Sequence, residues 1–225
     1  MEIWKFCVLF FCAFIGGTGI FLVKSYNSKL LKLILSFSGA YLFAITVLHL
    51  IPDAFSGPDK SEIGIFILVG FLLQVFLEQF SEGVEHGHIH KHHDGHVFPF
   101  GIMISLCLHA FLEGMPLAKE QHNELIFGIS LHHIPAAFAL GSILMQNHFK
   151  KGSIIIYLAV FAIMAPLGFY VSLGLSNGSI GGVEAYFNKI MGVVIGIFLH
   201  TSTTILFESS ADHKINLRKM IVVEI

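Results

Sequence analysis

The stretch SLCLHAFLEGMPLA, residues 105–118, is almost entirely apolar, yet it carries His109 and Glu113 four residues apart. In an α-helix, residues i and i+4 project from the same face. Ionisable groups inside a membrane span are costly, and by default they mark a functional site. We therefore expect this stretch to be a lipid-spanning helix with one polar face.

The composition of the whole chain indicates an integral membrane protein. Of its 225 residues, 55% are hydrophobic and only 12% are charged, and the mean hydropathy is +0.78. Soluble domains contain about 25% charged residues. The formal net charge of −2 gives no indication of a nucleic-acid partner. The cysteines lie singly in apolar segments, which argues against disulfide and thiolate–metal chemistry: Cys7, Cys12 and Cys107.

Seven apolar runs are long enough to cross a bilayer, which takes about 20 residues in a helix. We expect an all-α membrane protein with a single transmembrane domain over residues 1–225, whose first span is retained rather than cleaved as a signal peptide. The tail LRKMIVVEI (217–225) is too short to cross, so an eighth span is expected to be missing or truncated. The predicted spans are 3–23, 31–52, 62–81, 97–118, 125–146, 153–175 and 188–208.

The basic residues predict the orientation, because cytosolic loops carry an excess of lysine and arginine. Nine follow spans one, three, five and seven: Lys24, Lys29, Lys32, Lys91, Lys150, Lys151, Lys214, Arg218 and Lys219. Four lie at the N-terminus or in the other loops: Lys5, Lys60, Lys119 and Lys189. We therefore expect the N-terminus outside and the C-terminus in the cytosol, in the cell (plasma or inner) membrane.

The loop between spans three and four, residues 82–97, is polar, punctuated by glycine and predicted to be cytosolic. Histidine-rich tracts commonly bind metal, so we expect this loop to capture metal ions loosely. A solvated loop without such a role is the alternative. Six of the fourteen histidines lie here: His86, His88, His90, His92, His93 and His96.

A second group of histidines faces the opening stretch across a predicted hairpin. His132 and His133 lie in span five, which a short turn joins to span four. If the hairpin folds about residue 121, position 109 comes level with position 133. His109, Glu113, His132 and His133 then lie at one depth, and this mixture of nitrogen and oxygen ligands suits Zn²⁺, Fe²⁺ or Mn²⁺.

Other ionisable residues within the predicted spans suggest a path to and from this cluster. His49 and Asp53 repeat the i, i+4 spacing at the outer end of span two, where they could attract an arriving cation. Glu78 lies in span three and His200 in span seven. His200 is a candidate relay residue, and an ordinary helix–helix hydrogen bond explains it equally well.

Prolines and glycines in the spans predict local geometry. Pro116 and Pro135 each remove a backbone hydrogen bond, so both helices are expected to bend near the cluster. Gly114 allows a neighbouring helix to approach closely. Gly192 and Gly196 form a GxxxG pattern, which is typical of close helix packing and also of a homodimer face.

Together, these motifs resemble the ZIP (Zrt- and Irt-like) family of divalent metal transporters. The resemblance rests on HLIPD (49–53), the histidine-rich loop (86–96), HAFLEG (109–114) and HHIPAA (132–137), in that order. It implies an eight-helix fold with a binuclear metal site between spans four and five. By residue, it implies that His109, Glu113 and His132 are ligands and that His133 belongs to the second metal.

The chain departs from the family pattern at three positions of that second site. Alanine stands where many members have a polar ligand: Ala110, Ala136 and, in APLG (165–168), Ala165. We therefore infer one intact site of His109, Glu113 and His132, with His133 adjacent and water completing the shell.

The function that follows is transport of a divalent transition metal into the cytosol, with Zn²⁺ as the first choice of substrate and Fe²⁺ or Mn²⁺ as alternatives. The expected partners are the metal ion and the lipid bilayer, and we expect a transporter without catalytic residues. One alternative is a seven-span zinc-dependent hydrolase, which needs three protein ligands and an activated water. Another is a membrane protein that senses metal without transporting it.

Overall fold

The computed structural model describes residues 3–22, 28–56, 60–81, 83–84, 99–118, 123–176 and 187–208. These residues form helices and contain no strand. The helices are α1 (Ile3–Thr18), α2 (Ser28–Ile45), α3 (Ile51–Ser56), α4 (Lys60–Ser81), α5 (Phe100–Gly114), α6 (Asn123–Gln146), α7 (Lys151–Ser176) and α8 (Phe187–Glu208). Short 3₁₀ segments follow α1 (Gly19–Phe21) and α5 (Met115–Ala118), and a π-helical turn (Thr46–Leu50) joins α2 to α3.

Seven helical segments in the described part of the chain are long and apolar enough to cross a membrane. The prediction of seven spans and an all-α fold is therefore confirmed. Large apolar side chains on α4 point outward, as lipid contact requires: Ile65, Leu68, Val69, Leu72 and Phe76. A helix satisfies its own backbone polar groups, which is why such segments can lie in hydrocarbon. The chain is an integral membrane protein.

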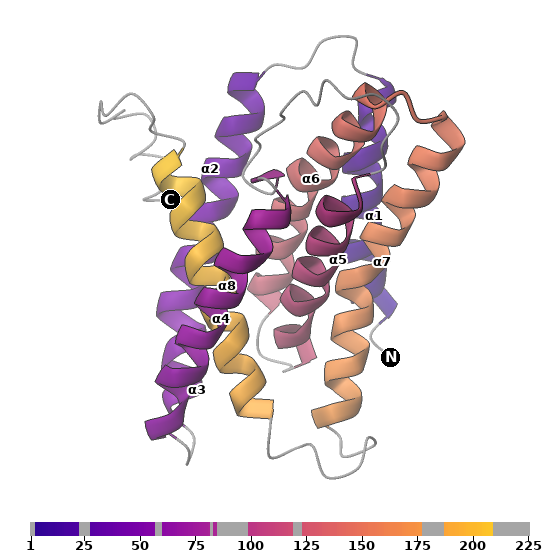
Figure 1. Cartoon of the computed structure of the whole chain (residues 1–225). Helices are drawn as coiled ribbons and strands as arrows, with labels where there is room; N and C mark the ends of the chain where they lie inside the picture. Colours follow the sequence, from indigo (N-terminus) through magenta and orange to yellow (C-terminus); the bar gives the residue numbers. More distant parts are fainter. Residues whose placement is uncertain are drawn as a thin grey trace.

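The helices pack in two groups, which lie side by side in Figure 1. In one group α6 packs mainly on α1, and α5 packs mainly on α7. In the other, α8 packs on both α4 and α2. The groups meet where α2 touches α6 and where α4 touches α5. Because α4 contacts α5, it can reach the polar face of the opening stretch.

Glycines bring helix backbones together within each group. A side chain at Gly114 would overlap the carbonyl oxygen of Ala165, and one at Gly168 would overlap that of Phe111, so α5 and α7 meet backbone to backbone. Small residues allow this close approach in membranes, where dispersion forces and hydrogen bonds hold helices together. The expected close approach at Gly114 is therefore present.

The GxxxG pattern of α8 packs inside the chain. Gly192 lies against Phe66, and a side chain at Gly196 would overlap the carbonyl oxygen of Ile67, both on α4. This packing accounts for the motif without a second copy of the chain. The homodimer stays a prediction that no longer draws support from these two glycines.

The proline at the end of α5 changes the helix type. Pro116 has no N–H to donate to the carbonyl of Leu112, and that carbonyl accepts instead from the N–H of Met115 as the helix tightens into a 3₁₀ turn. Pro135 lies inside α6, which continues to Gln146. Lys5, counted above among the outer basic residues, is a buried part of α1.

The histidine-rich loop and the tail fall almost wholly outside the described residues. Of residues 82–97 only 83 and 84 are described, so the predicted metal capture by the six loop histidines stays a prediction. The tail from residue 209 onward, which includes the predicted remnant of an eighth span, also lies outside.

Candidate metal centre

Three of the predicted ligands converge between α5 and α6. One ligand atom from each of His109, Glu113 and His132 lies within 4.8 Å of the others. The three side chains are 2%, 0% and 0% exposed, so water does not screen them. Two imidazoles and a carboxylate at this range form a donor set that a borderline divalent cation prefers. Within the described residues this is the one such group.

The i, i+4 spacing on α5 places His109 and Glu113 on one face of the helix, as predicted. His109 Nε2 lies 3.2 Å from Glu113 Oε1, so the ring and the carboxylate face the same point. The rings of His109 and His132 are 5.9 Å apart between centroids. The hairpin thus brings His132 on α6 level with His109 on α5, as the count of residues around the turn predicted.

His133 contacts the other side of the carboxylate. Its Nε2 lies 2.8 Å from Glu113 Oε2 and donates a hydrogen bond to it. Consecutive residues of a helix point about 100° apart, so His132 and His133 cannot both face one cation from the same direction. His132 converges with His109 and Glu113, whereas His133 forms a hydrogen bond with the carboxylate of Glu113.

The surroundings of His133 are apolar. Its ring makes an edge contact with Phe161, with 5.7 Å between centroids. Phe161 belongs to a buried cluster with Ala110 and Ala136, two of the three alanines at the second-site positions. Alanine at these positions supplies no oxygen or nitrogen for a second cation, so Glu113 Oε2 and His133 Nε2 are the polar atoms that the structure brings together on this side of the carboxylate.

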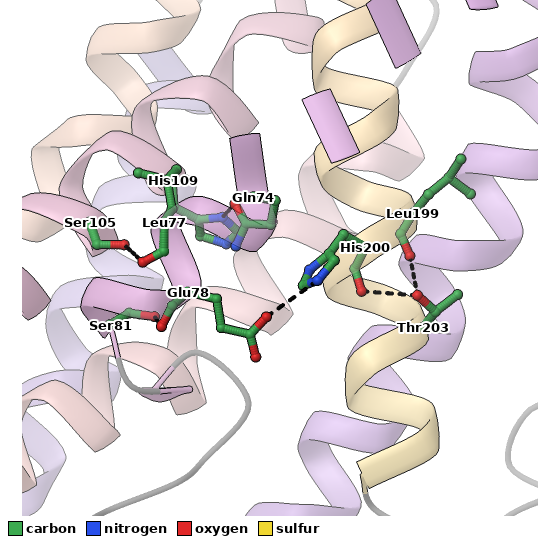
Figure 2. A network of polar contacts seen from close by, with 9 residues as sticks. All are labelled: Gln74, Leu77, Glu78, Ser81, Ser105, His109, Leu199, His200 and Thr203. Atoms are coloured by element: carbon green, nitrogen blue, oxygen red, sulfur yellow. Dashed lines mark hydrogen bonds and ion pairs between the residues drawn. The ribbon is translucent and has the colours of Figure 1, made fainter. Parts of the chain in front are cut away.

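Gln74 on α4 contacts His109, a neighbour that the sequence patterns did not predict. Its side chain is fully buried, and Oε1 accepts a hydrogen bond from His109 Nδ1 at 3.0 Å (Figure 2). A polar glutamine in an apolar span could have marked a functional site, as ionisable groups in spans do. Gln74 also stands four residues before Glu78, on the same helix face.

Glu78 and His200 form a second polar contact, one helical turn farther along α4. His200 Nε2 lies 3.3 Å from Glu78 Oε2 and joins α8 to α4 (Figure 2). His200 is nearly buried, and its ring meets Phe71 edge to face. His200 thus lies beside the carboxylate of Glu78 and is not one of the three converging ligands.

His49 and Asp53 lie apart from the centre. His49 sits in the π-helical turn that follows α2, and its side chain is exposed, whereas Asp53 lies in the first turn of α3 and is partly buried. In this turn Ile51 donates its N–H to the carbonyl of Thr46, five residues back. The π turn shifts the two side chains out of plain α-helical register, so the i, i+4 expectation does not transfer directly.

Comparison with known proteins matches residues 95–223 to a family model described as ZIP zinc transporter. This match covers more than half of the chain. The chain belongs to the ZIP family. The resemblance inferred from the motifs is thereby confirmed, and the family is one of transporters rather than hydrolases.

Individual ZIP relatives match over part of their length. Zinc transporter ZIP1 of Danio rerio is 28% identical over 137 residues, which cover 58% of this chain and 43% of the relative. Zinc transporter ZIP9 of Micropogonias undulatus is 31% identical over 130 residues, covering 52% and 41%. Zinc transporter zipt-7.1 of Caenorhabditis briggsae is 21% identical, covering 86% and 66%. The chain therefore spans about half the length of the curated relatives it matches.

Proposed function

We propose that this ZIP family member moves a divalent transition metal ion across the membrane into the cytosol, with Zn²⁺ as its first substrate and Fe²⁺ or Mn²⁺ as alternatives. The observation that carries the proposal is the convergence of His109, Glu113 and His132 in a buried position between two spanning helices. A carboxylate and two imidazoles can replace part of the hydration shell of the ion, as a site within the bilayer must.

The donor set also suits release. Three protein ligands leave at least one position of a tetrahedral zinc open to water or to the next ligand along the path. A closed four-ligand site of the structural kind would hold the ion too firmly. A three-ligand site of nitrogen and oxygen atoms therefore fits a transported ion better than a structural one.

The binding position takes one ion in this proposal. Glu113 Oε1 faces the ligand group, while Oε2 accepts the hydrogen bond from His133. The alanines at the second-site positions offer no ligand atom for a second cation, and Phe161 packs against the ring of His133. We assign His133 the task of orienting the carboxylate, which departs from the ligand role that the family resemblance implied.

Residues away from the centre provide the approach and the exit. His49 and Asp53, near the end of the second span, are the proposed first contacts for the arriving cation. His200 beside Glu78 is the proposed relay. The loop histidines take the released ion in the cytosol, and the excess of basic residues predicted for that side supports the cytosolic placement of the loop.

The membrane hydrolase, which the sequence left open, has no support from the family match or from the centre. A zinc hydrolase would need an activated water, a general base and a pocket for an organic substrate. Glu113 is the carboxylate of the converging group found among the described residues, and it is shared between His109 and His133. A carboxylate already shared in this way is poorly placed to act as a general base. A metal sensor without transport keeps the same ligands, and flux alone separates it from a transporter.

The experiment is metal uptake into liposomes that contain the purified full chain and an internal metal indicator. Wild type, the double variant His109→Ala/Glu113→Ala and the control His148→Asn would be compared with Zn²⁺, Fe²⁺, Mn²⁺ and Cd²⁺. His148 is exposed at the end of α6 with φ of 58°, a conformation that asparagine tolerates. Loss of flux in the double variant alone supports the site, whereas equal flux in all three proteins rejects it. Metal binding by wild type without flux would favour the sensor.

A further inference from the structure

Gln74 occupies an unusual position for an amide. It lies at the middle of α4, a helix whose outward side chains are apolar, and it is 0% exposed. A buried amide without hydrogen bonds costs several kcal/mol, and more so in a membrane than in water. The hydrogen bond from His109 Nδ1 at 3.0 Å satisfies the amide oxygen and points the side chain at the metal centre (Figure 2).

This hydrogen bond selects the state of the His109 ring. The amide oxygen of Gln74 can only accept, so His109 Nδ1 must carry the hydrogen. In a neutral imidazole the lone pair then lies on Nε2, the atom that faces Glu113 Oε1 at 3.2 Å. The nitrogen that can bind a cation is therefore the one that points into the ligand group.

We propose that Gln74 is a positioning residue for the transported metal: through its hydrogen bond to Nδ1 it holds the His109 ring in the orientation and tautomer in which Nε2 binds the ion. This inference rests on the proposed function of the His109–Glu113–His132 group. Histidines that bind metals usually donate their other ring N–H to an oxygen acceptor, which raises ligand basicity and fixes the ring. Here the acceptor comes from a different helix group.

Gln74 and His109 lie on helices that belong to different helix groups. α4 packs mainly on α8, whereas α5, which carries His109, packs mainly on α7. One helix group thus supplies the ligand, and the other orients it. A displacement of α4 relative to α5 would withdraw the acceptor from His109 and so lower the affinity for the ion, while His109, Glu113 and His132 stay together.

The same helix pair offers a matched control. Ser105, one turn before His109 on α5, donates a buried hydrogen bond of 2.7 Å to the carbonyl of Leu77 on α4. Ser105→Ala therefore removes a hydrogen bond between α4 and α5 without touching a ligand. Gln79→Leu replaces an exposed glutamine on α4 and controls for the amide itself.

The test measures binding of Co²⁺ to the detergent-solubilised full chain, with the six loop histidines replaced by serine so that the loop does not compete. Affinity is read by chelator competition, ligand geometry by the visible absorption of Co²⁺, and folding by thermal unfolding. Gln74→Leu is expected to weaken binding by about 10- to 100-fold and to alter the Co²⁺ spectrum. Gln74→Glu, which keeps an acceptor oxygen at the same reach, is expected to recover most of the affinity.

Two results would overturn the proposal. One is an unchanged affinity and spectrum in Gln74→Leu, and the other is an equal loss in Ser105→Ala, which would show that general contact between α4 and α5 is responsible. If Gln74→Leu does not fold, Gln74→Asn keeps the polarity but withdraws the oxygen, and it must lose affinity in the same direction. Failure of wild type itself to bind Co²⁺ would instead reject the proposed function.

Discussion

Glu113 on α5 and His133 on α6 are joined by a contact of 2.8 Å between a carboxylate oxygen and a ring nitrogen, both buried. The other oxygen of the same carboxylate faces His109 at 3.2 Å. One carboxylate thus divides its two oxygens between His109 and His133. In the proposed function, this division gives the adjacent histidines His132 and His133 different tasks, the first as a ligand and the second as the residue that orients Glu113.

Single alanine substitutions at the two adjacent histidines should separate these roles. His133→Ala removes a hydrogen bond to the ligand Glu113 and should weaken Zn²⁺ binding by about 10- to 100-fold, the usual effect of an outer partner. His132→Ala removes a ligand and should cost more. Titration calorimetry on the chain without loop histidines measures both. Equal losses, with a fall in stoichiometry from two ions to one in His133→Ala, would show that His133 binds a second metal.

The backbone contact between α5 and α7 should tolerate no added side chain. Gly168→Ala places a methyl group against the carbonyl of Phe111 and should destabilise the protein by about 1–3 kcal/mol, as overpacking does. Gly152→Ala, at the start of the same helix, meets nothing within 4 Å and should be neutral or stabilising by up to about 1 kcal/mol. Thermal unfolding in detergent compares them. Similar effects at both positions would argue against the close packing of α7 on α5.

The contact between Glu78 and His200 should affect flux rather than affinity at the centre. The pair lies one turn from Gln74 on α4 and contributes no atom to the ligand group. His200→Ala should therefore slow zinc uptake into liposomes while leaving the Kd of the central site within about twofold, a change under 0.5 kcal/mol. Thr203→Ser, a conservative change on the same helix, is the control. A flux equal to that of wild type would reduce the pair to a structural helix–helix contact.

Sequence patterns predicted the spans and the convergence of polar side chains between α5 and α6, because both depend on local spacing. About twenty apolar residues make a span, and helix periodicity with a hairpin count brings His132 and His133 level with His109 and Glu113. The contact of Gln74 with His109 could not be predicted in this way, since it depends on which helices of two groups become neighbours. The different contacts of His132 and His133 also could not be predicted, because both residues stand at the same depth and only the direction of each ring separates them. His49 and Asp53 repeat the spacing of His109 and Glu113, and the π turn that contains His49 shifts the two side chains out of plain α-helical register.

The most direct test of the central claim is zinc K-edge X-ray absorption, with metal analysis, on the purified full chain whose six loop histidines are replaced by serine. Three side chains converging on one buried point predict one Zn²⁺ per chain, with two imidazoles and only nitrogen and oxygen ligands at about 2.0–2.2 Å. His132→Ala should lose one imidazole from the spectrum, and His133→Ala should not. Two Zn²⁺ per chain, or a spectrum that His132→Ala leaves unchanged, would contradict the account.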